Sequence, residues 1–87
     1  MKIKGLDFIL TCEISPEQYD IKDIYGNQVG YVRLRWGTLT CEYPDCGGTL
    51  VYSVDLDDDA DGCFATQTQR DFHLNCIADK LLEVLAK

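Results

Sequence analysis

Apolar and polar residues alternate along most of the chain up to residue 56. A period of two is typical of a strand that buries one face, because successive side chains point to opposite sides. The alternation predicts strands at about residues 6–14, 19–25, 28–36, 38–43 and 49–56. The strand at 19–25 is the least regular, so we expect four or five strands.

The apolar side of each regular strand follows from this alternation. The sides expected to face the core are Leu6, Phe8, Leu10, Cys12 and Ile14; Val32, Leu34 and Trp36; Leu39, Cys41 and Tyr43; and Leu50, Tyr52, Val54 and Leu56. The dipeptides Gly26-Asn27 and Trp36-Gly37 are typical of tight turns. Because tight turns join antiparallel neighbours, each strand should pair with the next one along the chain.

The last part of the chain has a helical pattern instead, which predicts a helix at about residues 68–86. Its apolar stripe consists of Leu74, Ile77, Ala78, Leu81 and Leu85. Thr68, followed three residues later by Asp71, resembles a helix N-cap. We expect Phe64, just before the helix, to reach back to the core.

These elements predict an α+β fold in which one antiparallel sheet carries a single C-terminal helix on one face. The helix stripe is the only candidate cover for the apolar face of the sheet. With 87 residues, the chain has the length of one domain, and we assign residues 1–87 to it.

The net charge of −7 limits the kinds of partner. An acidic surface disfavours direct contact with nucleic-acid phosphates and with anionic membranes, and it suits a protein partner with a basic surface. The alternative is that the charge only keeps a soluble domain in solution. No secretory signal and no apolar run of about 18 residues occurs, so we expect a cytoplasmic protein.

Three aspartates at alternate positions, Asp57, Asp59 and Asp61, precede Gly62. This spacing matches the first half of a calcium loop, in which carboxylates converge on a cation and glycine allows the turn. The twelfth position of such a loop should be glutamate, but it is Thr68. The residues therefore leave two interpretations open, a site for calcium or magnesium and a solvated acidic turn.

A second set of candidate metal ligands combines Cys41 and Cys46 with His73 and Cys76. Three thiolates and one imidazole would make a closed structural zinc site. Four residues between the first two cysteines is at the edge of the usual spacing, and Cys41 alternates with apolar residues. The alternative is that Cys41 is a core residue. The count of five cysteines is odd, which argues against a disulfide framework.

Two further groups are candidate interaction residues. Tyr31, Arg33 and Arg35 share one face of a strand and are suited to bind a small anionic or aromatic ligand, unless the arginines pair with Asp20 and Glu42 on neighbouring strands. The acidic cluster is Asp55, Asp57, Asp58, Asp59 and Asp61. Carboxylates at this density imitate the charge of a nucleic-acid backbone, as in small phage inhibitors of nucleic-acid enzymes.

Three segments, Gly30–Gly37, Tyr43–Gly48 and Asp61–Phe64, give the chain a resemblance to a group of short uncharacterised bacterial and prophage proteins. The resemblance extends from about Tyr19 to the helix. It implies a mobile-element setting, which favours the inhibitor hypothesis. It supplies no functional residues, and no motif assigns the chain to an anti-CRISPR type.

We therefore expect a small acidic binding module without enzymatic activity, which acts by protein–protein contact. An anti-CRISPR-like inhibitor that mimics nucleic-acid charge is the most specific version of this hypothesis. The alternatives are a metal-binding structural domain, with zinc or calcium, and a small-ligand binder that uses Tyr31, Arg33 and Arg35. No catalytic residue group and no bound cofactor is expected. A homodimer through edge strands is left open.

Overall fold

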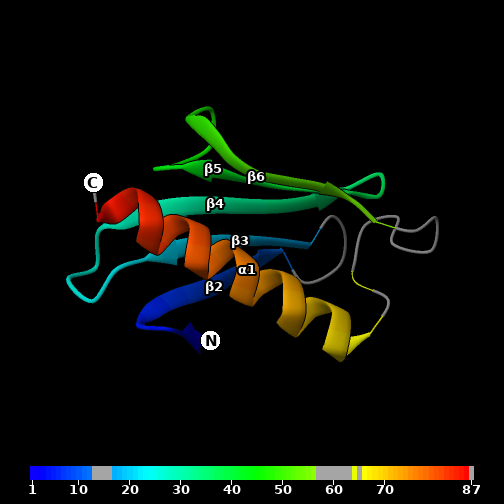
Figure 1. Cartoon of the computed structure of the whole chain (residues 1–87), viewed down its shortest axis with the longest axis horizontal. Coiled ribbons are helices and arrows are strands. Elements are labelled where there is room, and N and C mark those ends of the chain that lie inside the picture. The colour runs from blue at the N-terminus through cyan, green and yellow to red at the C-terminus, as the bar shows by residue number, and fades with distance from the viewer. Residues whose placement is uncertain (13–16, 57–63, 65, 87) are drawn as a thin grey trace.

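The computed structural model describes residues 1–12, 17–56, 64 and 66–86. The strands are β1 (Lys2–Ile3), β2 (Leu6–Cys12), β3 (Glu17–Lys22), β4 (Gln28–Arg35), β5 (Thr38–Tyr43) and β6 (Thr49–Asp55). They form one antiparallel sheet in the order of the chain, and helix α1 (Gln67–Leu85) follows (Figure 1). The predicted α+β fold is confirmed, with six strands in place of four or five.

Two strands differ from the prediction, the additional strand β1 and the shifted strand β3, and both differences result from the turns beside them. β1 has only two residues, too few for an alternating pattern, and a turn at Lys4 and Gly5 with positive φ angles of 54° and 87° joins it to β2. β3 ends at Lys22, earlier than predicted, because the next residue starts a loop. In that loop Asp23 Oδ1 accepts hydrogen bonds from the backbone N–H groups of Tyr25 and Asn27, both at 2.9 Å.

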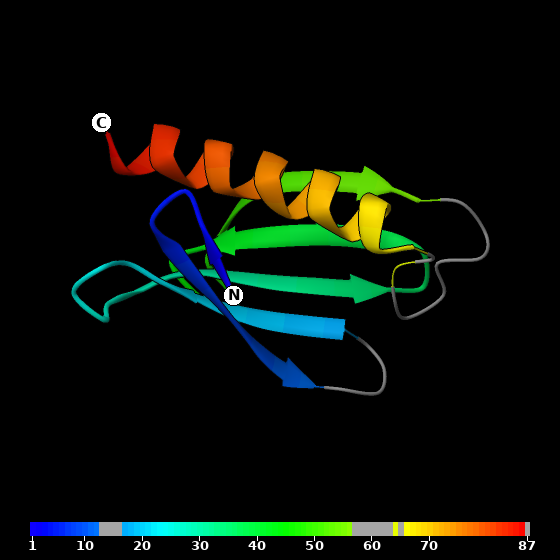
Figure 2. The same cartoon turned by 90° about the horizontal axis from the view of Figure 1, so that it is seen from below.

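Helix α1 lies across one face of the sheet, and the core lies between the two layers (Figure 2). Its backbone comes closest to the sheet at β1 and β6, because the sheet curls around it. In the centre, a Cβ atom on Gly30 would lie 2.9 Å from Leu81 Cδ1, so glycine there makes room for the helix. The buried apolar residues are Ile3, Leu6, Phe8, Tyr19, Ile21, Val29, Val32, Leu34, Leu39, Cys41, Phe64, Leu74, Ile77, Ala78 and Leu81.

Most of the predicted core residues are confirmed, including Phe64, but Leu10, Leu50, Leu85 and Trp36 are exposed. Leu50 is 56% exposed because a bulge between Cys41 and Glu42 places it opposite Glu42 on the other face. Leu10 is 44% exposed because β1 pairs only with the start of β2 and leaves the rest of β2 at the sheet edge. Leu85 is 39% exposed in the last turn of α1. Ile14 lies outside the described residues.

The N-cap of α1 is Thr66 and not Thr68, because Thr66 Oγ1 accepts a hydrogen bond of 3.0 Å from the N–H of Gln69. Thr66 and Gln69 fit the Ser/Thr-x-x-Glu/Gln spacing of a capping box better than Thr68 and Asp71 do. Within the described residues, no helix combines the length and apolar character needed to cross a membrane.

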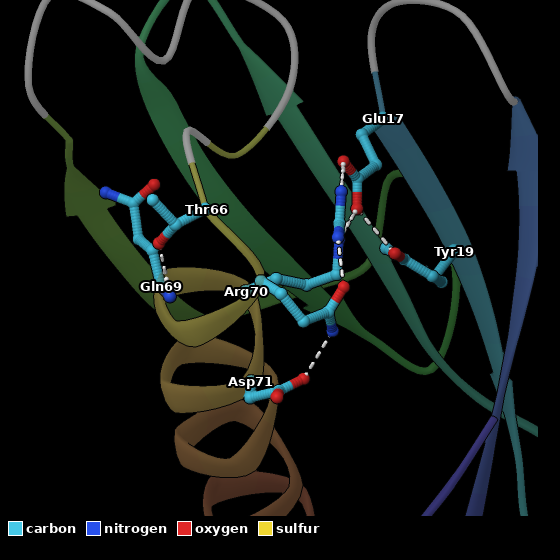
Figure 3. A network of polar contacts seen from close by, with 7 residues as sticks. Glu17, Tyr19, Thr66, Gln69, Arg70 and Asp71 are labelled. Atoms are coloured by element: carbon cyan, nitrogen blue, oxygen red, sulfur yellow. Dashed lines mark hydrogen bonds and ion pairs between the residues drawn. The ribbon is translucent and has the colours of Figure 1, made fainter.

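A buried carboxylate fixes the start of α1 to the sheet (Figure 3). Glu17 on β3 accepts hydrogen bonds from Arg70 Nε at 2.7 Å and from the second Arg70 nitrogen, Nη2, at 3.0 Å. The hydroxyl of Tyr19 donates a third at 2.5 Å. No pattern in the sequence indicates this network, because Glu17 and Arg70 are 53 positions apart.

The network shifts the pKa values of its members in opposite directions. Burial by itself raises the pKa of Glu17, but hydrogen bonds from Arg70 and Tyr19 and the charge of Arg70 outweigh it, so the pKa is lowered from 4.5. The pKa of Tyr19 is raised by burial and by its bond to Glu17. The hydrogen bond to Glu17 raises the pKa of Arg70. The ion pair is therefore charged throughout the neutral range.

Glu17→Gln should lower the free energy of unfolding at pH 7 by about 2–3 kcal/mol, because it removes the anion and leaves the guanidinium of Arg70 unpaired. Since the pKa of Glu17 is lowered in the folded state, its contribution is complete above pH 4.5, the ordinary pKa value, and is lost as pH falls through the lowered pKa. Urea unfolding measured between about pH 7 and pH 2 checks both statements.

The matched control is Glu83→Gln on the exposed side of α1, where the carboxylate lies 3.9 Å from Lys80 Nζ. It should change stability by less than about 0.5 kcal/mol, because exposed pairs contribute little. Equal losses for the two variants, or an unchanged acid limb in Glu17→Gln, would contradict a structural role for the buried pair.

Candidate functional site on the open face of the sheet

The face of the sheet opposite α1 is not covered by any element of the described chain (Figure 2). Cross-strand register arranges its side chains in rows. One row contains Arg35, Thr38 and Asp55, and the next contains Gln18, Arg33, Thr40 and Ser53. A third contains Ile9, Asp20, Tyr31, Glu42 and Leu50. We call this surface the open face.

A shallow hollow of about 480 Å³ lies at the end of the open face where β4 turns into β5. It is lined by Arg33, Arg35, Trp36, Thr38 and Thr40. A single hairpin provides all five side chains: two cations, one aromatic ring and two hydroxyl groups. The tight turn of this hairpin sets their spacing. The hollow joins part of the predicted Tyr31, Arg33 and Arg35 group to three residues that the prediction did not include.

Trp36 occupies an uncommon backbone position. It has a φ of 51° and Gly37 has a φ of 77°, and these two residues connect the paired Arg35 and Thr38. Two positive φ angles in a two-residue hairpin loop indicate a type I′ turn, which favours Asn-Gly and disfavours large side chains. The N–H of Leu56 donates a hydrogen bond of 2.6 Å to the carbonyl of Gly37, which ties the turn to the chain after β6.

The prediction that Trp36 faces the core with Leu34 is wrong. The strand ends at Arg35, so the alternation stops before Trp36, whose side chain is 78% exposed. The same dipeptide had also indicated a turn, and that prediction is confirmed. The turn chemistry overrides the period of two at this position.

Both arginines of the hollow are free of carboxylate partners within the described chain. Neither Arg33 nor Arg35 has a carboxylate oxygen within 4.0 Å among the residues placed by the structure. The guanidinium carbon of Arg35 lies 4.5 Å from the ring centre of Trp36, within the range of a cation–π contact.

Asp20 and Glu42, the expected partners of the arginines, lie on either side of Tyr31 in the cross-strand register. Burial is the main cause of the raised pKa of Tyr31, and the charges of these carboxylates add to it. In the described chain, Asp20 and Glu42 therefore do not neutralise Arg33 and Arg35. Tyr31 lies next to the hollow without lining it.

The hydroxyls of the hollow make contacts within the sheet. Thr38 Oγ1 donates a hydrogen bond of 3.0 Å to Asp55 Oδ1, and Thr40 Oγ1 donates one of 3.4 Å to the carbonyl of Arg33. Asp55 is the one member of the predicted acidic cluster that the structure describes. Asp57, Asp58, Asp59 and Asp61 lie outside the described residues, and so does the predicted calcium loop.

The proposed zinc ligands occupy different environments. Cys41 is fully buried in the core, and burial raises the pKa of its thiol to about 12. Cys46 is exposed in the loop between β5 and β6. His73 Nδ1 lies 3.1 Å from the hydroxyl of Tyr52, and burial lowers the pKa of His73. Among the described residues, no three His, Cys, Asp or Glu side chains gather as a metal site would require.

Sequence reasoning found Arg33 and Arg35 through their shared side of one strand but missed Trp36, Thr38 and Thr40 as their neighbours. A signal was present, because a tryptophan before glycine is disfavoured in a tight turn with positive φ angles. Once the turn fixes the pairing of β4 with β5, Thr38 lies opposite Arg35 and Thr40 lies opposite Arg33.

The comparisons with known proteins add no relative: no protein-family model, no curated protein and no solved structure matches this chain.

Replacing Trp36 by asparagine should stabilise the protein by about 0.5–1 kcal/mol, because asparagine tolerates a positive φ and leaves no apolar ring in water. The lost cation–π contact with Arg35 offsets part of this gain. For a domain of this size the melting temperature should rise by about 2–8 °C. Thermal unfolding followed by circular dichroism measures the change.

Gly37→Ala in the same turn is the control for backbone strain. It adds a Cβ at a φ of 77°, where nothing but a backbone oxygen at 3.7 Å is near, so conformation is the main penalty. It should destabilise the protein by about 1 kcal/mol. A Trp36→Asn variant that melts below the wild type would show that the ring contributes to folding.

Proposed function

We propose that this protein is a non-enzymatic binding module that acts by protein–protein contact, and that the open face around Trp36 is its contact surface. The observation that carries the proposal is the position of Trp36. Its ring is 78% exposed, on a turn whose positive φ disfavours a large side chain. Backbone strain and apolar exposure at one residue are typical of sites kept for function, and tryptophan is enriched among residues that dominate binding energy.

The shape of the surface favours a protein over a small molecule as the partner. The hollow is shallow and lined by one hairpin, whereas pockets for small ligands enclose most of the ligand surface. Two further exposed apolar side chains lie on the open face, at the two ends of the row that contains Tyr31: Ile9 on β2, 40% exposed, and Leu50 on β6, 56% exposed. An exposed aromatic ring with arginine side chains beside it is typical of a protein interface.

The phage-inhibitor version of this function remains a prediction. It needs the acidic cluster to face a basic groove, and the net charge of −7 is its support. Calcium or magnesium binding by Asp57, Asp59 and Asp61 remains a prediction in the same way. The contact surface proposed for Trp36 does not depend on either of these.

A comparative capture experiment tests the proposal. The wild-type protein, Trp36→Asn and Lys80→Gln are immobilised and exposed to a lysate of the organism that carries the gene, and retained proteins are identified by mass spectrometry. We expect one partner retained by the wild type and by Lys80→Gln, which changes an exposed charge on α1. Trp36→Asn should retain less than about a tenth of it, because aromatic anchors contribute about 2 kcal/mol or more.

Circular dichroism of Trp36→Asn confirms that lost binding is not lost folding. Equal retention by Trp36→Asn and the wild type would overturn the proposed contact surface. Retention that falls as salt increases from about 50 to 500 mM would add a charged component to the contact, because salt screens charges at protein surfaces.

A further inference from the structure

We infer that the hollow beside Trp36 is a carboxylate-binding site, and that the partner places there an acidic side chain with an apolar side chain next to it. The inference rests on the proposed contact surface and names the chemistry of its partner. The occupant is therefore a protein segment that combines Asp or Glu with an apolar residue.

The two arginines are arranged to hold a carboxylate. Arg33 and Arg35 lie two positions apart on β4, so they project from the same side at a Cα spacing of about 7 Å. Neither is neutralised by a carboxylate of the described chain. A planar guanidinium donates two parallel hydrogen bonds to a carboxylate. One carboxylate bound by both Arg33 and Arg35 would offset the conformational entropy that the two side chains lose.

Trp36 positions one of these guanidiniums. The guanidinium carbon of Arg35 lies over the ring, 4.5 Å from its centre, within the range of a cation–π contact. Within the described chain the guanidinium of Arg35 makes no ion pair, so its N–H groups are available to a ligand. The rest of the ring is exposed beside the hollow and is available to an apolar side chain of the partner.

The surrounding charge favours a single carboxylate over a nucleic-acid strand. Asp20 and Glu42 flank Tyr31 in the row next to Arg33, and Asp55 lies in the row of Arg35. A nucleic-acid strand carries one negative charge per phosphate, so its further phosphates would face these carboxylates and the net charge of −7. A single carboxylate needs to meet only the two arginines.

The chain provides its own reporter, because Trp36 is the only tryptophan in the sequence. Tryptophan fluorescence is followed while the protein is titrated with the peptide Ac-Glu-Leu-Glu-NH₂ at low salt. The neutral peptide Ac-Gln-Leu-Gln-NH₂, inorganic phosphate and a thymidine oligonucleotide are titrated in parallel. We expect saturable change with the acidic peptide, at least about fivefold weaker binding of the neutral peptide, and weaker binding of the two phosphate probes.

Three variants test the role of the arginines. Arg35→Gln should weaken binding of the acidic peptide at least about fivefold, and Arg35→Lys should weaken it about threefold because the charge remains but the paired donors are lost. Lys80→Gln removes the same charge from α1, far from the hollow in the fold, and should leave binding unchanged. Equal weakening by Lys80→Gln and Arg35→Gln would overturn the local site.

The inference is also overturned if the neutral peptide binds as well as the acidic one, or if phosphate or the oligonucleotide binds more tightly. These results do not decide the proposed function. A partner captured through Trp36 would still establish the contact surface, with a different group in the hollow. If the acidic peptide does not bind, and Trp36→Asn also retains as much of the partner as the wild type does, both the contact surface and the carboxylate site are overturned.

Discussion

The packing of one helix into the concave side of a curled sheet is the constraint on which the rest of this structure depends. The sheet brings its edge strands β1 and β6 toward α1, while Gly30 lets Leu81 approach the central strand β4. Fifteen buried apolar residues of the described chain meet between the two layers. Among the elements that the structure places, only α1 covers a face of the sheet, so the opposite face presents its own side chains.

Two polar contacts hold the helix to the sheet, one near its start and one further along. Near its start, Arg70 reaches the buried carboxylate of Glu17 on β3. Further along, Asp79 accepts a bond of 2.5 Å from Lys4 in the turn between β1 and β2. The first contact is buried and the second is exposed to solvent, so the first contributes more to stability. Together they cross-link strands near one edge of the sheet to the helix that covers them.

The fold could be predicted from the sequence because its elements have clear periods. The spacing of Leu74, Ile77, Ala78 and Leu81 indicated the helix, and all four residues are fully buried. Alternation identified β4 and β5 to within one residue. The errors occur where a local feature breaks the period. A bulge moves Leu50 to the open face, a turn ends the alternation before Trp36, and β1 is too short to show any pattern.

The candidate site was less accessible to sequence reasoning than the fold. Arg33 and Arg35 were recognisable because they share one side of a strand. Whether they are neutralised depends on neighbouring strands, and the register places Asp20 and Glu42 beside Tyr31 instead. Cys41 alternates with apolar residues in the sequence, and its burial in the core agrees with that pattern more than with a zinc ligand.

The hydrogen bond between the N–H of Leu56 and the carbonyl of Gly37 has a consequence for recognition. It ties the turn that carries Trp36 to the residue that follows β6, outside the β4–β5 hairpin, so the turn is held from a second point in the chain. A side chain with two rotatable bonds on a turn held in this way loses little conformational entropy when a partner covers it. The small surface of an 87-residue protein can then give useful affinity without a rearrangement of its backbone.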